Sequence, residues 1–162
     1  MIDDKIIKNI IASLKERFKG AYFYESSVKQ GIKTPCFFIR IINSNIKREL
    51  EERFYVNHDL AITYLPKKAL FSKNYEEDTQ MIKTDMLFAL EELKTDSGYL
   101  YAKNLSIETN YDDFGAFFTA HATYECAYRK DKDKYYMLKL KEIGKVGSNG
   151  KENNRRNYWK IL

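Results

Sequence analysis

The stretch from Gln30 to Ile42 constrains the fold more than any other part of the chain. A polar turn with Gly31 leads into eight residues, Pro35 to Ile42, of which seven are apolar. This run is too short for a solvent-facing helix and is rich in strand-forming residues. Gly31 can adopt a positive φ, and Pro35 fixes its own φ and favours an extended Thr34. The sequence therefore predicts a central strand that is entered through a turn of fixed geometry.

Two segments have helical periodicity. Apolar residues recur every four positions from Ile2 to Phe18, which predicts an amphipathic helix that ends near Gly20. The second helix is expected to begin at an N-cap, Asn74, and to be closed by Ser97-Gly98. Its predicted inner face consists of Ile82, Met86, Ala89, Leu90 and Leu93.

The remaining periodic segments predict strands. Apolar and polar residues alternate from Phe54 to Tyr64, which is typical of a strand with one buried face that ends before Pro66. Ala21 to Ser26 is expected to be a short strand that forms a hairpin with the Gln30 strand. Tyr99 to Asn110 and Gly115 to Tyr128 predict a second hairpin around a polar turn. Asn43 to Glu52 is charged and is expected to be a solvated loop or one helical turn. Tyr135 to Ile143 is expected to be either a last strand or a helical turn.

The order of these segments predicts an α+β fold. We expect a single domain in which two helices pack on a mostly antiparallel sheet of four to five strands. A chain of 162 residues can bury roughly two thirds of its unfolded surface without metal or disulfide bonds. The domain is predicted over residues 1–134, followed by a basic C-terminal extension over residues 135–162.

The excess positive charge belongs to that extension. From Arg129 onwards the chain has eleven Lys and Arg residues against four Asp and Glu, whereas the first 128 residues have 17 against 19. Residues 144–156 have the composition of a flexible linker. Apolar residues follow it, so we expect a partner-binding tail made of Arg155, Arg156, Tyr158, Trp159, Ile161 and Leu162. A solvated tail that orders on a protein partner is one interpretation, and binding to nucleic-acid phosphates is the alternative.

The sequence contains no pattern typical of a catalytic, metal or cofactor site. His58 and His121 lie on separate predicted strands without ligands at metal-site spacing, and Cys36 and Cys126 are expected to be buried free thiols. Asp112 and Asp113 are interpreted as turn formers. No apolar run is long enough to span a membrane and the N-terminus does not resemble a signal peptide, so we expect a cytoplasmic protein. Because catalytic, metal and cofactor patterns are missing, we expect it to be non-enzymatic and without cofactors.

Several of these features together resemble the phage tail terminator (tail completion) family of Gram-positive prophages and phage-tail-like bacteriocins. The resemblance covers about residues 1–128 and rests on an N-terminal helix, a Gln-Gly turn, a Pro-x-Phe-Phe strand and a Tyr-x-Pro strand end. The residues that carry it are Gln30, Gly31, Pro35, Phe37, Phe38, Arg53, Tyr64 and Pro66.

The resemblance implies a structural protein of the phage tail. Members form a hexameric ring on the last ring of the tail tube, stop its polymerisation and offer a face to the head connector or cap. The implied partners are therefore copies of the same chain, the tube protein, and in contractile particles the sheath, with DNA only passing through the lumen and no membrane. Such a protein would reside in the bacterial host cytoplasm during assembly and afterwards in the particle. The main alternative is a nucleic-acid-binding accessory protein that acts through the basic tail.

Overall fold

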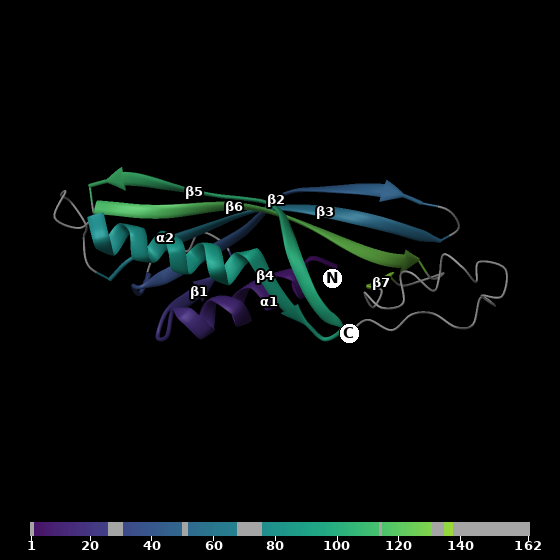
Figure 1. Ribbon diagram of the computed structural model, residues 1–162, viewed down its shortest axis with the longest axis horizontal. Helices are drawn as coiled ribbons and strands as arrows, with labels where there is room; N and C mark the ends of the chain where they lie inside the picture. Colours follow the sequence, from purple (N-terminus) through teal and green to yellow (C-terminus); the bar gives the residue numbers. More distant parts are fainter. Residues whose placement is uncertain are drawn as a thin grey trace.

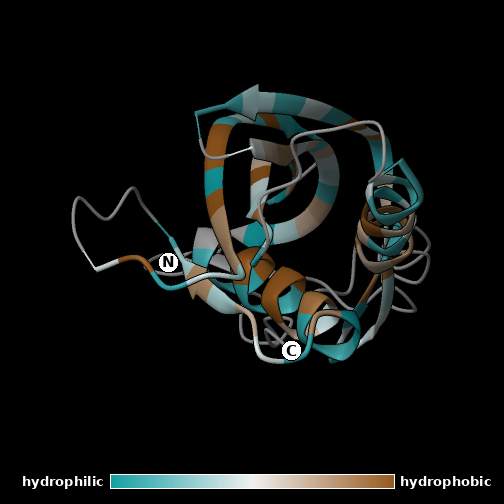
Figure 2. Cartoon of the chain, turned by 90° about the vertical axis from the view of Figure 1, so that its left-hand side faces the viewer, coloured by the Kyte–Doolittle hydropathy of each residue, from teal (hydrophilic) through white to brown (hydrophobic). Residues whose placement is uncertain are grey.

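The computed structural model describes residues 2–25, 31–49, 52–67, 76–113, 115–130 and 135–137. Within these residues the chain forms two helices on one side of a strongly curled sheet, which confirms the α+β prediction (Figures 1 and 2). The elements are α1 (Ile2–Arg17), β1 (Tyr22–Tyr24), β2 (Cys36–Arg48), β3 (Arg53–Leu65), α2 (Glu76–Glu91), β4 (Glu92–Thr95), β5 (Gly98–Asp112), β6 (Gly115–Lys130) and β7 (Tyr135–Met137).

The strand order is β1-β2-β3-β6-β5-β4, and β7 pairs with β6. The sheet exceeds the predicted four to five strands because β1, β4 and β7 have only three or four residues each, too few to show a period in the sequence. All pairings are antiparallel except that of β1 with β2. The hairpin with a loose loop that was predicted between these two strands is therefore wrong, because a hairpin joins antiparallel strands and this pair is parallel.

Strand β2 is longer than predicted and is not central. It continues through Arg48, so the expected loop or helical turn from Asn43 onwards is wrong. Beyond a bulge between Ile41 and Asn43, it stays in register with β3 as far as the pair of Arg48 with Phe54. Ladder hydrogen bonds to a 13-residue neighbour outweigh the weak strand propensity of this polar segment. The central strands are β3 and β6.

Helix α2 is shorter than predicted at its C-terminal end. It ends at Glu91, and Leu93 belongs to strand β4, where it pairs with Leu100. Ser97 lies between β4 and β5 and Gly98 is the first residue of β5, so the pair does not close the helix. Leu93 is buried as predicted, but it lies in a strand. A single apolar residue is compatible with both the helical and the strand period, so the sequence pattern did not separate the two. The proposed N-cap, Asn74, lies outside the described residues.

The core lies between the concave face of the sheet and the two helices (Figure 2). The alternation predicted for β3 is confirmed, with Phe54, Val56, His58, Leu60, Ile62 and Tyr64 all buried. The equivalent face of β6 is also buried and consists of Phe118, Ala120, Ala122, Tyr124, Cys126 and Tyr128. Ile6, Ile10 and Leu14 of α1 and Met86, Ala89 and Leu90 of α2 close the core from the other side.

Candidate assembly interface

Part of the sequence motif forms an aromatic cluster at the start of β2. Phe37 lies opposite Tyr64 in the β2–β3 register, with ring centroids 4.6 Å apart. Phe18, just after α1, contacts both rings at 5.0 Å, and Phe23 of β1 stacks on Phe37 at 5.4 Å. Because the four rings are packed on one another, they stabilise the fold, and Phe37 and Tyr64 are buried and so inaccessible to a partner.

The other motif residues surround this cluster or lie far from it. Gly31 has φ of 79°, as the predicted turn requires. Pro35 directly precedes Cys36, and Pro66 directly follows Leu65, the partner of Cys36, so both prolines lie at the same end of the sheet. The Pro35 carbonyl accepts a hydrogen bond of 2.9 Å from the Tyr22 amide, which aligns β1 with β2.

Phe38 is half-buried and stacks on Tyr24 at 5.4 Å. Arg53 lies at the opposite end of β3, across from Arg129. The structure thus places Pro35, Phe37, Phe38, Tyr64 and Pro66 at one end of the sheet and Arg53 at the other. Gln30 and the tail residues Arg155, Arg156, Tyr158, Trp159, Ile161 and Leu162 lie outside the described residues.

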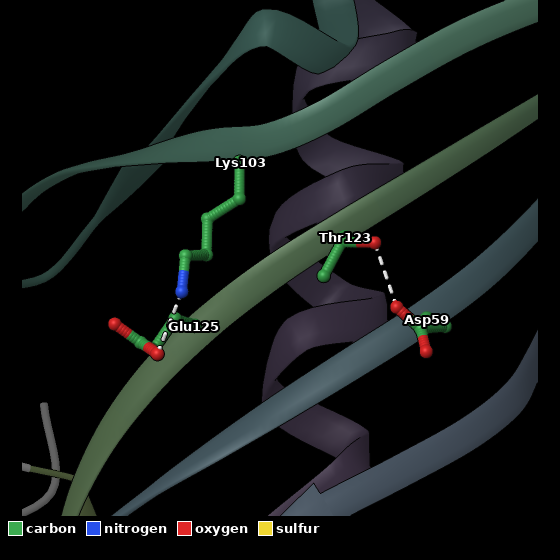
Figure 3. Close-up of polar contacts among 4 residues, drawn as sticks. All are labelled: Asp59, Lys103, Thr123 and Glu125. Atoms are coloured by element: carbon green, nitrogen blue, oxygen red, sulfur yellow. Dashed lines mark hydrogen bonds and ion pairs between the residues drawn. The ribbon is translucent and has the colours of Figure 1, made fainter.

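The outer face of the sheet carries polar side chains that link neighbouring strands (Figure 3). Thr123 of β6 donates a hydrogen bond of 2.6 Å to Asp59 of β3. Lys103 of β5 forms a 2.8 Å ion pair with Glu125 of β6. These two contacts between neighbouring strands therefore help to fix strand register.

The described residues that could have carried chemistry are buried or scattered. No three His, Cys, Asp or Glu side chains among them could hold a metal ion. The buried His58 ring lies with Nδ1 3.0 Å from the Ser44 hydroxyl, whereas His121 is exposed. Cys36 and Cys126 are buried free thiols, as predicted. Desolvation raises the pKa of the Cys126 thiol to about 12, so it is protonated at neutral pH and unsuited to nucleophilic attack.

Among the described residues, large apolar side chains are exposed singly at Tyr22 and Ile32 and in three groups outside the core. One group lies on β2 and consists of Ile42 and Ile46, the latter 70% exposed. A second lies on α2 and consists of Met81, Leu87 and Phe88. The third lies on β5 and consists of Tyr99, Tyr101 and Tyr111. Exposed apolar and aromatic side chains on a small domain mark candidate contact surfaces.

Two of these groups lie on strands that, among the described residues, are paired on one side only along part of their length. Beyond Phe38, where the pairing with β1 ends, β2 pairs within the described residues only with β3. We call this segment, residues 39–48, the β2 edge. Strand β5 leaves β4 after Tyr101 and from Ala102 to Asp112 pairs, in the same described part, only with β6. We call residues 102–112 the β5 edge. Strand edges present backbone donors and acceptors that can pair with another chain.

Comparison with known families gives the fold its context. The family described as phage tail terminator protein matches residues 5–135, which include α1 from Lys5 onwards, α2 and the sheet as far as the first residue of β7. The chain belongs to a phage tail terminator family. No curated protein matches it.

The match covers the residues that carried the resemblance and also the surfaces that sequence reasoning missed. The β2 edge was missed because its charged and amide residues favour a loop. One available signal was the long alternation of β3, since the backbone groups of a long strand with a buried face have to be paired by neighbouring strands. None of the helices in the described part of this tail protein is long and apolar enough to cross a membrane.

Proposed function

We propose that the chain acts as a ring, a hexamer by the family resemblance, that caps the head-proximal end of a tail tube. The ring would stop polymerisation of the tube, and of a sheath where there is one, and present a docking face for the head connector or cap. Its role would be structural, and DNA would only pass through its lumen. The observation that carries this proposal is the family match over residues 5–135.

The surface of the domain supports such a role. A ring needs two different lateral surfaces on each subunit, so that every contact is heterologous and the set closes by rotation. The β2 edge and the β5 edge are two such surfaces, and exposed apolar side chains lie on both, Ile46 on the first and Tyr111 on the second. Further exposed apolar residues on α2, including Phe88, leave a surface for the tube or the connector.

The free protein can be monomeric and still act in this way. Six subunits that bind the end of a tube are held at high effective concentration, so weak lateral contacts suffice once the tube acts as a template. Particle mass in solution therefore informs on the lateral contacts, while termination itself has to be measured on tails.

The test of function is deletion of the gene in the strain that produces the particle. Without this protein, tails are expected to grow to irregular lengths or to lack their head or cap, as seen by negative-stain electron microscopy. Labelled protein supplied in trans should restore a narrow length distribution and map to one end of the tail. Normal tails in the deletion strain, or label along the whole tube, would contradict the proposal.

A further inference from the structure

The β2 edge and the β5 edge carry opposite charges. Strand β2 contains Arg40, Lys47 and Arg48 and no acidic residue. The β5 edge contains Glu108 and Asp112 and one basic residue, Lys103, which is paired with Glu125 on β6. One edge therefore attracts the other, and two β2 edges repel each other.

The two edges also end at opposite ends of the molecule (Figure 1). In Figure 1 the end of β2 lies at the right of the long axis and the end of β5 at the left, and the two arrows point in opposite directions. Because β2 and β5 run in opposite directions within one copy, a second copy in the same orientation could place its β5 edge beside the β2 edge of the first with the strands antiparallel. The contact is heterologous, because a different segment of each copy takes part.

The face of the sheet on which each side chain lies limits the registers in which the two edges can pair. Asn43, Asn45 and Lys47 pair with Asp59, Asn57 and Tyr55, which alternate with the buried residues of β3 and so lie on the outer face. Glu108, Asn110 and Asp112 lie on the same face, since they pair with Thr119, Phe117 and Gly115 of β6 and alternate with residues opposite the buried Phe118 and Ala116. In a continuous sheet, outer residues must stand opposite outer residues.

One of the permitted registers places a lysine opposite a glutamate and also pairs a long segment of each edge. If Lys47 stands opposite Glu108, then Asn45 stands opposite Asn110 and Asn43 opposite Asp112. On the inner face, this register sets the exposed Ile46 against Thr109 and Ser44 against the exposed Tyr111. Residues 43–48 of one chain then pair with residues 107–112 of the next.

We propose that the β2 edge of one copy pairs, antiparallel and with Lys47 opposite Glu108, with the β5 edge of a second copy. This inference rests on the proposed ring and names its lateral contact. The basic residues and the bulge of β2 are the devices by which edge strands avoid uncontrolled pairing. Here they reject a second β2 edge and leave an acidic β5 edge as the matching partner.

Engineered cysteines test this contact directly. Residues opposite each other in an antiparallel pair have Cβ atoms about 4.5–5.5 Å apart, close to the range in which disulfides form. Asn45→Cys and Asn110→Cys are therefore made separately and mixed at high concentration under a mild oxidant. The mixture is expected to give a covalent dimer on non-reducing gels, and the double variant a ladder of oligomers. The native thiols do not compete, because Cys36 is 0% and Cys126 2% exposed.

Three controls make the result specific to this register. Each single variant alone should stay monomeric, and a dimer from Asn45→Cys alone would instead show pairing between two β2 edges. Thr109→Cys in place of Asn110→Cys puts the thiol on the inner face and should give no dimer with Asn45→Cys. Lys47→Glu should lower the yield of mixed dimer about tenfold, and Glu108→Lys in the second variant should restore it.

The outcomes separate this contact from the proposed function. Absence of the mixed dimer, or a yield that Lys47→Glu leaves unchanged, overturns the edge pairing. If Lys47→Glu also restores tails of normal length in the deletion strain, termination stands and the ring closes through other surfaces. If tails are normal in the deletion strain itself, the terminator function fails whatever the cross-linking shows.

Discussion

At the scale of single residues, the turn before β2 depends on one backbone conformation. Gly31 has φ of 79°, and no atom would lie within 4 Å of an added Cβ. Gly31→Val is therefore expected to destabilise the protein by about 1–3 kcal/mol through backbone strain alone. For a chain of this size that lowers the melting temperature by roughly 2–4 °C per kcal/mol.

Gly31→Asn is the matched control for this turn. Asn tolerates a positive φ far better than a β-branched residue, so its melting temperature should fall much less. Equal melting temperatures for Gly31→Val and the natural protein, measured by circular dichroism, would contradict the role assigned to the turn.

The buried thiols give a second prediction at this scale. Burial raises the pKa of Cys36 and of Cys126, the latter to about 12. Native protein at pH 8 should therefore react negligibly with a thiol reagent such as DTNB, and both thiols should react in denaturant. Rapid labelling of native protein would show that one thiol is accessible.

The same shifts predict an alkaline limit of stability. A thiol whose pKa is higher in the folded state favours folding below its unfolded pKa, near 9.0 for Cys126, and this contribution is lost as the pH rises towards 12. Burial also raises the pKa of Tyr124. The melting temperature should therefore fall as the pH increases above 9, and Cys126→Ala should flatten that dependence.

At the scale of elements, the C-terminus of α2 is held by side chains from two other elements. The Tyr124 hydroxyl of β6 donates a 2.5 Å hydrogen bond to the Leu90 carbonyl, and the Ser13 hydroxyl of α1 donates to the Ala89 carbonyl, also at 2.5 Å. Both carbonyls belong to the last turn of the helix, where no intrahelical donor is available. These two bonds tie the helices and the sheet together.

Removal of the Tyr124 hydroxyl should therefore destabilise the whole domain. Tyr124→Phe leaves the buried Leu90 carbonyl without this donor and is expected to cost about 1–3 kcal/mol in denaturant unfolding. Tyr99→Phe removes the same group from an exposed position and should change stability by less than about 0.5 kcal/mol. Equal effects of the two substitutions would argue against this cap of α2.

At the scale of the whole molecule, the charge of the chain is divided between two parts. The first 128 residues have two more acidic than basic residues, while the remainder has a balance of +7. We propose that the C-terminal residues 158–162 dock on a neighbouring subunit or tail partner. The composition of residues 144–156 predicts a flexible linker, and thirteen such residues have a root-mean-square span of roughly 20 Å.

Truncation measures the contribution of this tail. Removal of residues 144–162 is expected to leave the melting temperature unchanged and to weaken assembly. Assembly is measured as the fraction of capped tails. Matched truncated and full-length proteins should be compared for DNA binding across a range of salt concentrations. Normal assembly combined with loss of salt-dependent DNA binding would contradict docking and favour the nucleic-acid alternative.

The sequence by itself determined the elements whose period extends over many residues. The alternation of β3 and β6 assigned both faces of the two central strands, and the four-residue repeat of α1 assigned its buried side, because side-chain period follows directly from backbone geometry. The motif residues Phe37 and Tyr64 were found by resemblance, but their packing against Phe18 was not, since it joins three elements.

Only the tertiary structure decided the elements whose form depends on a neighbour. The β2 edge is a strand because it pairs with β3. Strand β1 pairs in parallel with Cys36–Phe38, and α2 is followed by β4, in which Leu93 pairs with Leu100. Each of these segments is short or polar, so local propensity is weak and hydrogen bonds from the adjacent strand dominate. The edges left free by these pairings, and with them the candidate interface, follow from strand order, which no local pattern encodes.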